Sequence, residues 1–486
     1  MILVTPSQME SIDRDTIQQH GLASLVLMEN AARSVLPLLP RGPVAVLVGP
    51  GNNGGDGLVL ARALHEQGRP TMAYLLSENL SPDAETQLKL AREWDVPLTP
   101  LWDDDSKGPS FEAGSVIIDA LFGTGLGREL VGRYARTLEA ANSANAFRVA
   151  IDIPSGVDGA SGRVLGTSFK ADLTVTFGVA KWGHVLHPGK ERCGRLEITQ
   201  PGFHPGALRQ HGAVRYVTPD LASSLLPSDW PTMHKGDNGR VLLVTGSNTY
   251  PGAGILSTLG AIHGGAGLVS YASTEGLRDA IMAWTPEALL LDRGSLDDLS
   301  PYNVLVIGSG LGDDTDRLGS DLLSRFEGPV VVDADALRLV SRFSYEKRRE
   351  WVLTPHPGEL ARLLGRSVAQ MEKDRIGTAL EAAEHLGSVV CFKGAPTVCA
   401  SPDGRALVNS SGHSVLAQGG SGDVLAGLIG AYIAYGLPAL EATAAAVYVH
   451  GLAAQILADD GSPRGVGAHA VAACLPRAFG LAVGKD

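Results

Sequence analysis

Short apolar runs alternate with longer mixed segments along most of this chain. In residues 1–200, the apolar runs predict strands at 44–48, 71–76, 115–121, 148–153, 173–177 and 195–199. The mixed segments at 58–67 and 86–94 fit helices, and residues 1–35 fit a helical lead-in. Strands that are apolar throughout are typical of a parallel sheet covered by helices on both faces. The pattern therefore predicts an α/β fold.

A stretch rich in proline and glycine, 200–231, interrupts this alternation. Beyond it, apolar runs predict further strands at 241–245, 268–272, 304–307, 330–332, 351–354 and 389–392. Clusters of proline and glycine are typical of domain boundaries, and 486 residues exceed the usual size of one domain. We therefore predict two domains, at 1–205 and 231–486, joined by a linker at 206–230.

Composition narrows the class of protein. A hydrophobic content of 44% suits a packed protein, and a net charge of −12 argues against nucleic acid as a partner. The N-terminus lacks a signal-like core, and the apolar stretch 424–449 is broken by Pro438 and Glu441, so we predict a cytoplasmic protein without a membrane span. We expect free, buried thiols from the four cysteines, Cys193, Cys391, Cys399 and Cys474.

Two glycine-rich turns, at 49–57 and 419–423, each carry one acid, Asp56 and Asp423, and each precede a predicted helix. Such a turn aims backbone N–H groups and the positive end of the helix dipole at an anion. Two turns of this kind predict two ligand sites in separate domains. Neither turn matches GxxxxGK[ST], which disfavours P-loop chemistry. Gly49, Gly51 and Gly54 have the GxGxxG spacing, but we do not expect an ordinary Rossmann dinucleotide site at this turn.

Polar residues of the first half follow several predicted strands. Ligands of open parallel sheets bind beyond the carboxyl ends of the strands, where this sequence places 52–57, Asp119, 123–129 and 152–155. Oxygen atoms of Asn, Asp and Ser suit a group I or II cation. A carboxylate such as Asp152 could equally transfer protons, and each acid taken alone could merely cap a helix.

Four basic residues gather after the predicted strand at 173–177: Lys181, His184, His187 and Lys190. An ammonium such as Lys181 could face an anion. Four basic side chains close together are more typical of a surface in contact with water. We therefore interpret this segment as a solvated loop.

In the second half, Asp423 begins a predicted helix and could take a proton from a hydroxyl while backbone N–H groups hold a transferring phosphoryl group. Lys393 ends a predicted strand and could place its ammonium near a nucleotide phosphate. His356 could contact a substrate or bond to the backbone of its own turn. Asp333 and Asp335 could bind a metal or cap local structure.

Ten motifs in order resemble a known pair of fused domains. LMENA at 27–31, NNGGDG at 52–57, DALFGTG at 119–125 and DIPSG at 152–156 resemble the NAD(P)H-hydrate epimerase domain, also called the YjeF N-terminal domain. The other motifs resemble the ADP-dependent NAD(P)H-hydrate dehydratase of ribokinase-like fold: HKGD at 234–237, YPGA at 250–253, GSGLG at 308–312, HPGE at 356–359, KG at 393–394 and GGSGD at 419–423.

The resemblance covers nearly the whole chain and implies a Rossmann-like three-layer sandwich followed by a ribokinase-like one. Hydrated NADH or NADPH carries a C6 hydroxyl in the R or S configuration. The first domain would interconvert the epimers, as an isomerase. The second, a lyase, would phosphorylate the S epimer from ADP and expel phosphate, giving NAD(P)H, AMP and phosphate. The implied cofactors are ADP, Mg²⁺ and K⁺, the partners are NAD(P)H hydrates and ADP, and we expect a homo-oligomer.

The same resemblance assigns residues. In the epimerase, the hydrate would contact Asn52, Asn53, Gly54, Gly55, Asp56, Gly123, Thr124, Gly125, Leu126, Gly127, Arg128, Glu129 and Asp152, and potassium would be held by Asn53, Asp119 and Ser155. In the dehydratase, the hydrate would contact Ala253, Gly310, His356 and Asp423. The nucleotide would lie on Lys393, Gly394, Ala395, Pro396, Thr397, Gly419, Gly420, Ser421 and Gly422. Asp152 and Asp423 are the predicted catalytic residues, with Asp423 as the base.

Two other functions fit these motifs. The chain could be a ribokinase-like small-molecule kinase whose first domain only binds a ligand, or the first domain could serve as a scaffold without catalysis. Many relatives have threonine where this chain has Ser421, and we expect little effect because the hydroxyl is kept.

Overall fold

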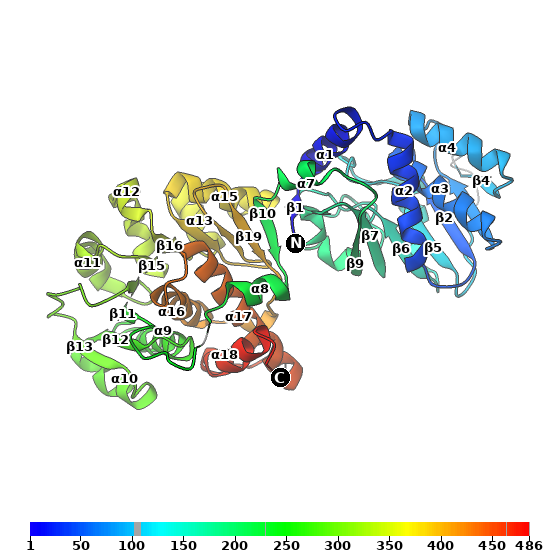
Figure 1. Ribbon diagram of the computed structural model, residues 1–486. Helices are drawn as coiled ribbons and strands as arrows, with labels where there is room; N and C mark the ends of the chain where they lie inside the picture. Colours follow the sequence, from blue (N-terminus) through cyan, green and yellow to red (C-terminus); the bar gives the residue numbers. More distant parts are fainter. Residues whose placement is uncertain (102–107, 229, 463, 486) are drawn as a thin grey trace. The chain divides into compact units, whose positions relative to one another are not determined.

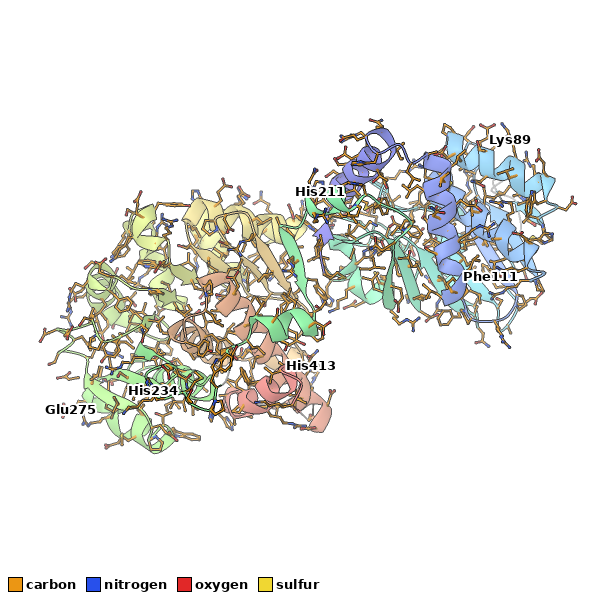
Figure 2. The ribbon with its side chains drawn as sticks, in the orientation of Figure 1. Lys89, Phe111, His211, His234, Glu275 and His413 are labelled. Carbon is orange, nitrogen blue, oxygen red and sulfur yellow. The ribbon has the colours of Figure 1, made fainter. Side chains whose placement is uncertain are left out.

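The computed structural model describes residues 1–101, 108–228, 230–462 and 464–485. Contacts divide the chain into two compact units, Met1–Val214 and Arg215–Asp486. In each unit, side chains fill the space between helices and sheet (Figure 2), whereas the labelled Lys89 and Glu275 lie exposed at the outside. Each unit is described by itself below.

The first unit is built on a seven-stranded parallel sheet in the order β4-β3-β2-β5-β6-β7-β9. Its strands are β2 (Val44–Val48), β3 (Thr71–Leu75), β4 (Leu98–Pro100), β5 (Val116–Ala120), β6 (Phe147–Ile151), β7 (Leu173–Phe177) and β9 (Arg195–Thr199). Strands β2, β5 and β7 are buried along their whole length, which explains their continuous apolar sequence. The predicted strands of this half are confirmed, but three short strands were missed: the partly exposed β4, and the paired β1 (Leu3–Val4) and β8 (Ala180–Lys181).

Helices cover this sheet, and α3 packs against β2, β3 and β5 while α2 and α4 pack against α3. The helices of the unit are α1 (Pro6–Gln18), α2 (Ser24–Val35), α3 (Asn52–Glu66), α4 (Pro82–Glu93), α5 (Gly132–Ser143), α6 (Lys190–Cys193) and α7 (Pro205–Arg209). The start of the chain is more than a helical lead-in. Strand β1 (Leu3–Val4) pairs in parallel with β8 (Ala180–Lys181), which ties α1 to a segment far along the chain.

The second unit is built on a ten-stranded sheet in the order β10-β19-β18-β17-β16-β15-β14-β11-β12-β13. Its strands are β10 (Val214–Val217), β11 (Arg240–Val244), β12 (Leu268–Ser273), β13 (Leu289–Asp292), β14 (Val304–Ile307), β15 (Val330–Val332), β16 (Trp351–Leu353), β17 (Val389–Phe392), β18 (Val398–Ala400) and β19 (Ala406–Asn409). Strands β11 to β17 pair in parallel, and β18 and β19 pair antiparallel. All strands predicted for this half are present, but β10, β13, β18 and β19 were missed.

Helices α9, α16 and α17 pack on this sheet and on one another (Figure 1). The helices of the unit are α8 (Pro219–Leu225), α9 (Pro251–His263), α10 (Arg278–Trp284), α11 (Ser320–Arg325), α12 (Tyr345–Arg348), α13 (Pro357–Leu364), α14 (Val368–Met371), α15 (Arg375–Leu386), α16 (Ser421–Ala434), α17 (Ala439–Asp460) and α18 (Ala468–Ala482). By length and composition alone α17 could cross a membrane, but 78% of its apolar stretch lies buried inside the unit. It is a core helix here.

The segment predicted as a linker, 206–230, contains the division between the units but is not irregular. It contributes most of α7, all of α8 and the strand β10, which lies beside β19 at the edge of the large sheet (Figure 1). Proline starts both helices, so the proline-rich composition reflects helix N-termini as well as a boundary. The four cysteines are free and buried, as predicted.

Candidate active sites in the two units

A cavity of about 1030 Å³ lies in the first unit, at the carboxyl ends of β2, β5 and β6. Of the residues predicted to bind substrate, those lining it are Asn52, Asn53, Asp56, Gly123, Thr124, Gly125, Leu126, Gly127, Arg128 and Asp152. Gly54, Gly55 and Glu129 are not among its lining residues. Asp13 and Lys181 also line it, and neither was predicted to belong to the site.

The glycines of the first turn serve packing. Helix α3 begins at Asn52, earlier than predicted, so Gly54 and Gly55 lie in its first turn. A Cβ on Gly54 would approach a backbone oxygen to 2.0 Å, and one on Gly55 would approach Met28 Cε to 2.7 Å. The absence of side chains therefore lets α3 lie close to the strand ends and to α2, which places Asn52, Asn53 and Asp56 at the cavity.

Asp152 and Lys181 form a buried ion pair, with 2.6 Å between Oδ1 and Nζ. The ammonium also donates to Thr176 Oγ1 at 2.8 Å and to the carbonyl of Phe177 at 3.4 Å, so all three of its N–H groups have acceptors. Thr176 in turn donates to Asp152 Oδ1 at 3.0 Å. Burial works to raise the pKa of Asp152, but attraction to Lys181 and these hydrogen bonds hold it below its ordinary value. Asp152 is therefore an anion at neutral pH.

His184 forms hydrogen bonds to the backbone of both members of the pair, Lys181 and Asp152. Its Nδ1 accepts from the backbone N–H of Lys181 at 2.9 Å, so its Nε2 donates to the carbonyl of Asp152 at 2.8 Å. Burial, and then repulsion from Lys181, lower the pKa of His184 to about 4, which keeps the ring neutral. Our interpretation of the segment that follows β7 as a solvated loop was wrong for Lys181 and His184, which are almost wholly buried. The apolar neighbours Ala180 and Trp182 were the sequence signal for that burial.

Of the three residues predicted to hold potassium, Asn53 lines the cavity, and Asp119 and Ser155 are not among its lining residues. Asp119 accepts from the backbone N–H and the hydroxyl of Ser155, both at 2.7 Å, and Ser155 Oγ accepts from the N–H of Phe122. Burial raises the pKa of Asp119 to about 6 against these hydrogen bonds. The amide oxygen and nitrogen of Asn53 are buried without a hydrogen-bond partner. A buried amide oxygen without a partner suits a cation.

Two further acids face the cavity without a lysine of their own. Burial is the main cause that raises the pKa of Asp13 to about 6, with attraction to Lys181 opposing it and repulsion from Asp152 and Glu10 adding to it. Burial, with repulsion from Asp152 and Asp13, raises the pKa of Asp56 well above its ordinary value. Both groups can therefore hold a proton under conditions in which an exposed aspartate would not.

The second unit contains its own buried ion pair, between Asp333 and Lys393 at 2.9 Å. Asp333 also accepts from Thr354 Oγ1 at 2.6 Å and from Ser309 Oγ at 2.8 Å. Burial works to raise the pKa of Asp333, but Lys393 and the two hydroxyls hold it below its ordinary value. A Cβ on Gly422 would lie 3.3 Å from Lys393 Nζ, so the ammonium reaches the glycine-rich turn. Both carboxylate oxygens of Asp333 therefore have partners in the protein.

Asp423 lies in the first turn of α16, whose N-cap Gly420 adopts a left-handed φ of 92°. Burial, and then repulsion from Asp333, raise the pKa of Asp423 to about 6, while Lys393 and a hydrogen bond from Ser309 oppose the shift. Asp423 therefore lies close enough to Asp333 and Lys393 to feel both charges, but it is not part of their ion pair. An aspartate tuned to this range can accept a proton near neutral pH.

The loop predicted to hold the nucleotide, 393–397, is supported by an arginine that the sequence did not point to. Arg375 Nε donates to the carbonyl of Pro396 and Nη2 to that of Lys393, both at 2.7 Å, and its guanidinium lies 4.0 Å from the Phe392 ring centroid. A Cβ on Gly394 would approach Arg375 Nη2 to 2.0 Å. This buried side chain fixes the loop that carries Lys393.

Three more predicted residues fall into place around this site. Ala253 begins α9 beside Gly310, because a Cβ on Gly310 would lie 2.8 Å from that of Ala253. His356 caps α13: its Nδ1 accepts from the N–H of Gly358, and Glu359 completes a capping box. The bond of His356 to the backbone of its own turn is present, and half of its side chain stays exposed.

Two side chains support loops from within. Ser421 Oγ donates to the carbonyls of Leu416 and Gln418, so the hydroxyl proton is used within the glycine-rich turn. Asp335 accepts from the N–H of Gly312, which is the capping role. Among the residues that the structure describes, no group of three or more His, Cys, Asp or Glu side chains is arranged to hold a metal ion.

Two family models match the chain: YjeF-related protein N-terminus over residues 24–183, and NAD(P)H-hydrate dehydratase over residues 241–477. The bifunctional NAD(P)H-hydrate repair enzyme of Thermofilum pendens is 36% identical and aligns with 97% of this chain and 95% of its own length. That of Moorella thermoacetica is 37% identical, with 93% and 92% covered.

Solved structures resemble the second unit. An ADP/ATP-dependent NAD(P)H-hydrate dehydratase from Bacillus subtilis, co-crystallised with ATP and Mg²⁺, is 31% identical with a TM-score of 0.50 and covers 55% of this chain and 99% of that one. A ribokinase-like superfamily protein from Enterococcus faecalis is 28% identical with a TM-score of 0.51, over 56% of this chain and 96% of that one. The second unit therefore has a ribokinase-like fold, and the chain belongs to the family of bifunctional NAD(P)H-hydrate repair enzymes.

Proposed function

We propose that this chain repairs hydrated NAD(P)H with one activity in each unit. The first unit interconverts the R and S hydrates, and the second dehydrates the S hydrate at the expense of ADP, giving NAD(P)H, AMP and phosphate. The observation that carries this assignment is the presence of two separately built acid sites, at Asp152 and at Asp423, in a chain that aligns over nearly its full length with bifunctional repair enzymes.

In the second unit, Asp423 is the base. It takes the proton of the C6 hydroxyl as that oxygen bonds to the terminal phosphorus of ADP and AMP leaves. The C6–O bond of the resulting phosphate ester then breaks, phosphate leaves, and a proton is lost from C5. These changes restore the double bond between C5 and C6. The backbone of 419–422 and the ammonium of Lys393 hold the phosphate charge. Mg²⁺ bound with the nucleotide would supply further positive charge.

In the first unit, the hydrate lies in the cavity with its reacting ring near Asp152. Breaking the C6–O bond leaves positive charge on C6 and N1, and a carboxylate kept ionised by Lys181 stabilises that charge. The unsatisfied amide of Asn53, with Asp119 and Ser155, fits K⁺, which would supply a fixed positive charge beside the substrate.

We place the protein in the cytoplasm and expect a homo-oligomer, whose number of subunits light scattering can measure.

An epimer-resolved assay tests the two activities. Purified R and S hydrates are incubated with the chain, with and without ADP and Mg²⁺, and followed by chromatography and by absorbance of the reduced nicotinamide. We expect R and S to interconvert without nucleotide, and S to return to NAD(P)H only with it. A stable phosphorylated product without recovered NAD(P)H would instead identify a kinase. Consumption of S alone would show that the first unit only binds.

A further inference from the structure

Three carboxyl groups line the cavity of the first unit from three different elements: Asp13 from α1, Asp56 from α3, and Asp152 from the loop after β6. Of these three acids, Lys181 donates a hydrogen bond to Asp152 alone, because its three N–H groups are taken by Asp152, Thr176 and a backbone carbonyl. Among the described residues, neither Asp13 nor Asp56 receives a hydrogen bond. Two carboxyl groups thus line the cavity without a hydrogen-bond partner in the part of the chain that the structure describes.

An unpaired carboxylate in such a wall is costly unless it binds a proton or a ligand. The charged groups facing Asp13 are Glu10 on its own helix, Asp56 on α3, Asp152 after β6 and Lys181 on β8. Acids outnumber the single cation in this set. The shared negative charge favours a state in which Asp13 and Asp56 hold one proton between them.

The position of Asp13 is held firmly from both ends of its helix. At the start, the Thr5 capping box fixes α1, and the adjoining β1 pairs with β8 in a register that sets Val4 opposite Lys181. Near the end, Thr16 Oγ1 accepts from the backbone N–H of His204 at 3.3 Å. Residues 6, 7, 9, 10 and 17 also line the cavity, so α1 is one of its walls. The epimerase family model begins only at residue 24, beyond this helix.

We infer that Asp13 is a further catalytic residue of the epimerase, which exchanges a proton with the C6 hydroxyl from one wall of the cavity while Asp56 does so from another. This inference rests on the proposed function of the first unit. In one direction, Asp13 gives its proton to the hydroxyl, the C6–O bond breaks, water leaves, and the N1 electron pair forms an N1=C6 double bond. Water then adds to the opposite face of C6 and loses its proton to the Asp56 carboxylate, while the electron pair returns to N1. The reverse reaction exchanges the two roles, so atoms and protons balance.

The test compares Asp13→Asn with Asp15→Asn in the full chain. The Asp15 variant likewise loses a carboxyl from this helix, but Asp15 does not line the cavity and its carboxylate accepts a hydrogen bond from the Gln19 side chain. We expect Asp13→Asn to slow R-to-S conversion by roughly 10²–10⁴-fold, as for loss of a general acid, and Asp15→Asn to leave it unchanged. Dehydration of the S hydrate, measured in the same samples, should be unaltered in both. Wild-type chain that fails to epimerise would refute the proposed function itself, whereas a fully active Asp13→Asn would refute only the role of Asp13.

Two readouts separate catalysis from a structural role. Wild-type epimerisation should have a bell-shaped pH profile, because one acid must be protonated while the other is ionised, and Asp13→Asn should lose one limb. Asp13→Glu keeps the carboxyl and should keep both limbs at reduced rate, so the test stands even if the Asn variant unfolds the first unit. In H₂¹⁸O, each epimerisation should add one labelled oxygen at C6. An unchanged pH profile in Asp13→Asn, or epimerisation without label, would overturn the inference.

Discussion

Each unit buries one lysine against one aspartate at the carboxyl edge of its sheet, but the two lysines are used differently. In the first unit, Lys181 is 1% exposed and all its N–H groups are engaged, so it holds Asp152 and has no N–H group left for a ligand. In the second, Lys393 is 21% exposed and reaches the glycine-rich turn. The first lysine is part of the scaffold of its site, and the second can also meet a ligand.

The acids outside the two pairs show what pairing does. Asp152 and Asp333 have lowered pKa values because a lysine compensates the cost of burial. Asp423, which stands beside a pair, has its pKa raised to about 6, and so does Asp13. A proton-transfer residue needs a pKa near the working pH. The comparison therefore indicates that proton transfer is the role of the acids without a lysine partner, Asp423 in the second unit and Asp13 in the first.

The largest effect is expected from Asp423→Asn. Loss of the base should reduce ADP-dependent dehydration by roughly 10²–10⁴-fold, while epimerisation by the first unit stays at the wild-type rate. Both are measured with purified S and R hydrates. If this one change removed both activities, the two sites could not be independent.

Asp152→Asn should do the reverse and should also weaken the fold. It abolishes epimerisation, and it leaves Lys181 buried without its partner, which costs about 3–5 kcal/mol of unfolding free energy. Urea unfolding of the variant measures this loss. Asp152→Asn combined with Lys181→Met should recover most of the stability without recovering epimerisation. Recovery of both would mean that the pair is only structural.

The pH dependence sharpens the contrast. Asp423 must be ionised to act as a base, so dehydration should rise as pH increases through about 6 and then level off. Epimerisation should instead fall on both sides of an optimum. Rates of the two reactions, measured on one preparation across pH 5–8.5 at saturating substrate, give the two profiles. A dehydration rate that does not change between pH 5 and pH 7 would contradict the role of Asp423.

A smaller effect is expected at the loop that carries Lys393. Arg375→Met removes two hydrogen bonds to the backbone of that loop, so the KM for ADP should rise by about tenfold, the equivalent of one to two hydrogen bonds at roughly 1 kcal/mol each. Arg362, which lies exposed on α13, offers a matched control in Arg362→Met. Equal KM values in the two variants would show that Arg375 does not position the loop.

The smallest effect is expected from Ser421→Thr. The hydroxyl that closes the turn is kept, so kcat and KM for ADP should change less than about twofold. Ser421→Ala is the informative control, because it removes both hydrogen bonds and should cost about 1 kcal/mol of stability or ADP affinity. If threonine were as damaging as alanine, space rather than hydrogen bonding would govern this position.

Much of the fold could be predicted because the parallel strands are buried on both faces and are therefore apolar throughout, as in 44–48 and 304–307. The missed strands β4, β13 and β1 are short or partly exposed and carry no such signal. The loop residues of both sites could also be predicted, since they follow strand ends and lie at one edge of a sheet. The ligand roles given to them remain predictions.

The sequence by itself determined the α/β architecture, the two units and the polar loops at the strand ends, because periodicity and strand-end position are local properties. Only the tertiary structure decided which acids are paired. Lys181 meets Asp152 and Lys393 meets Asp333 across long stretches of chain, and α1 reaches the first cavity through the pairing of β1 with β8. A pKa depends on burial and on neighbours within a few ångströms, and neither is written in the order of residues.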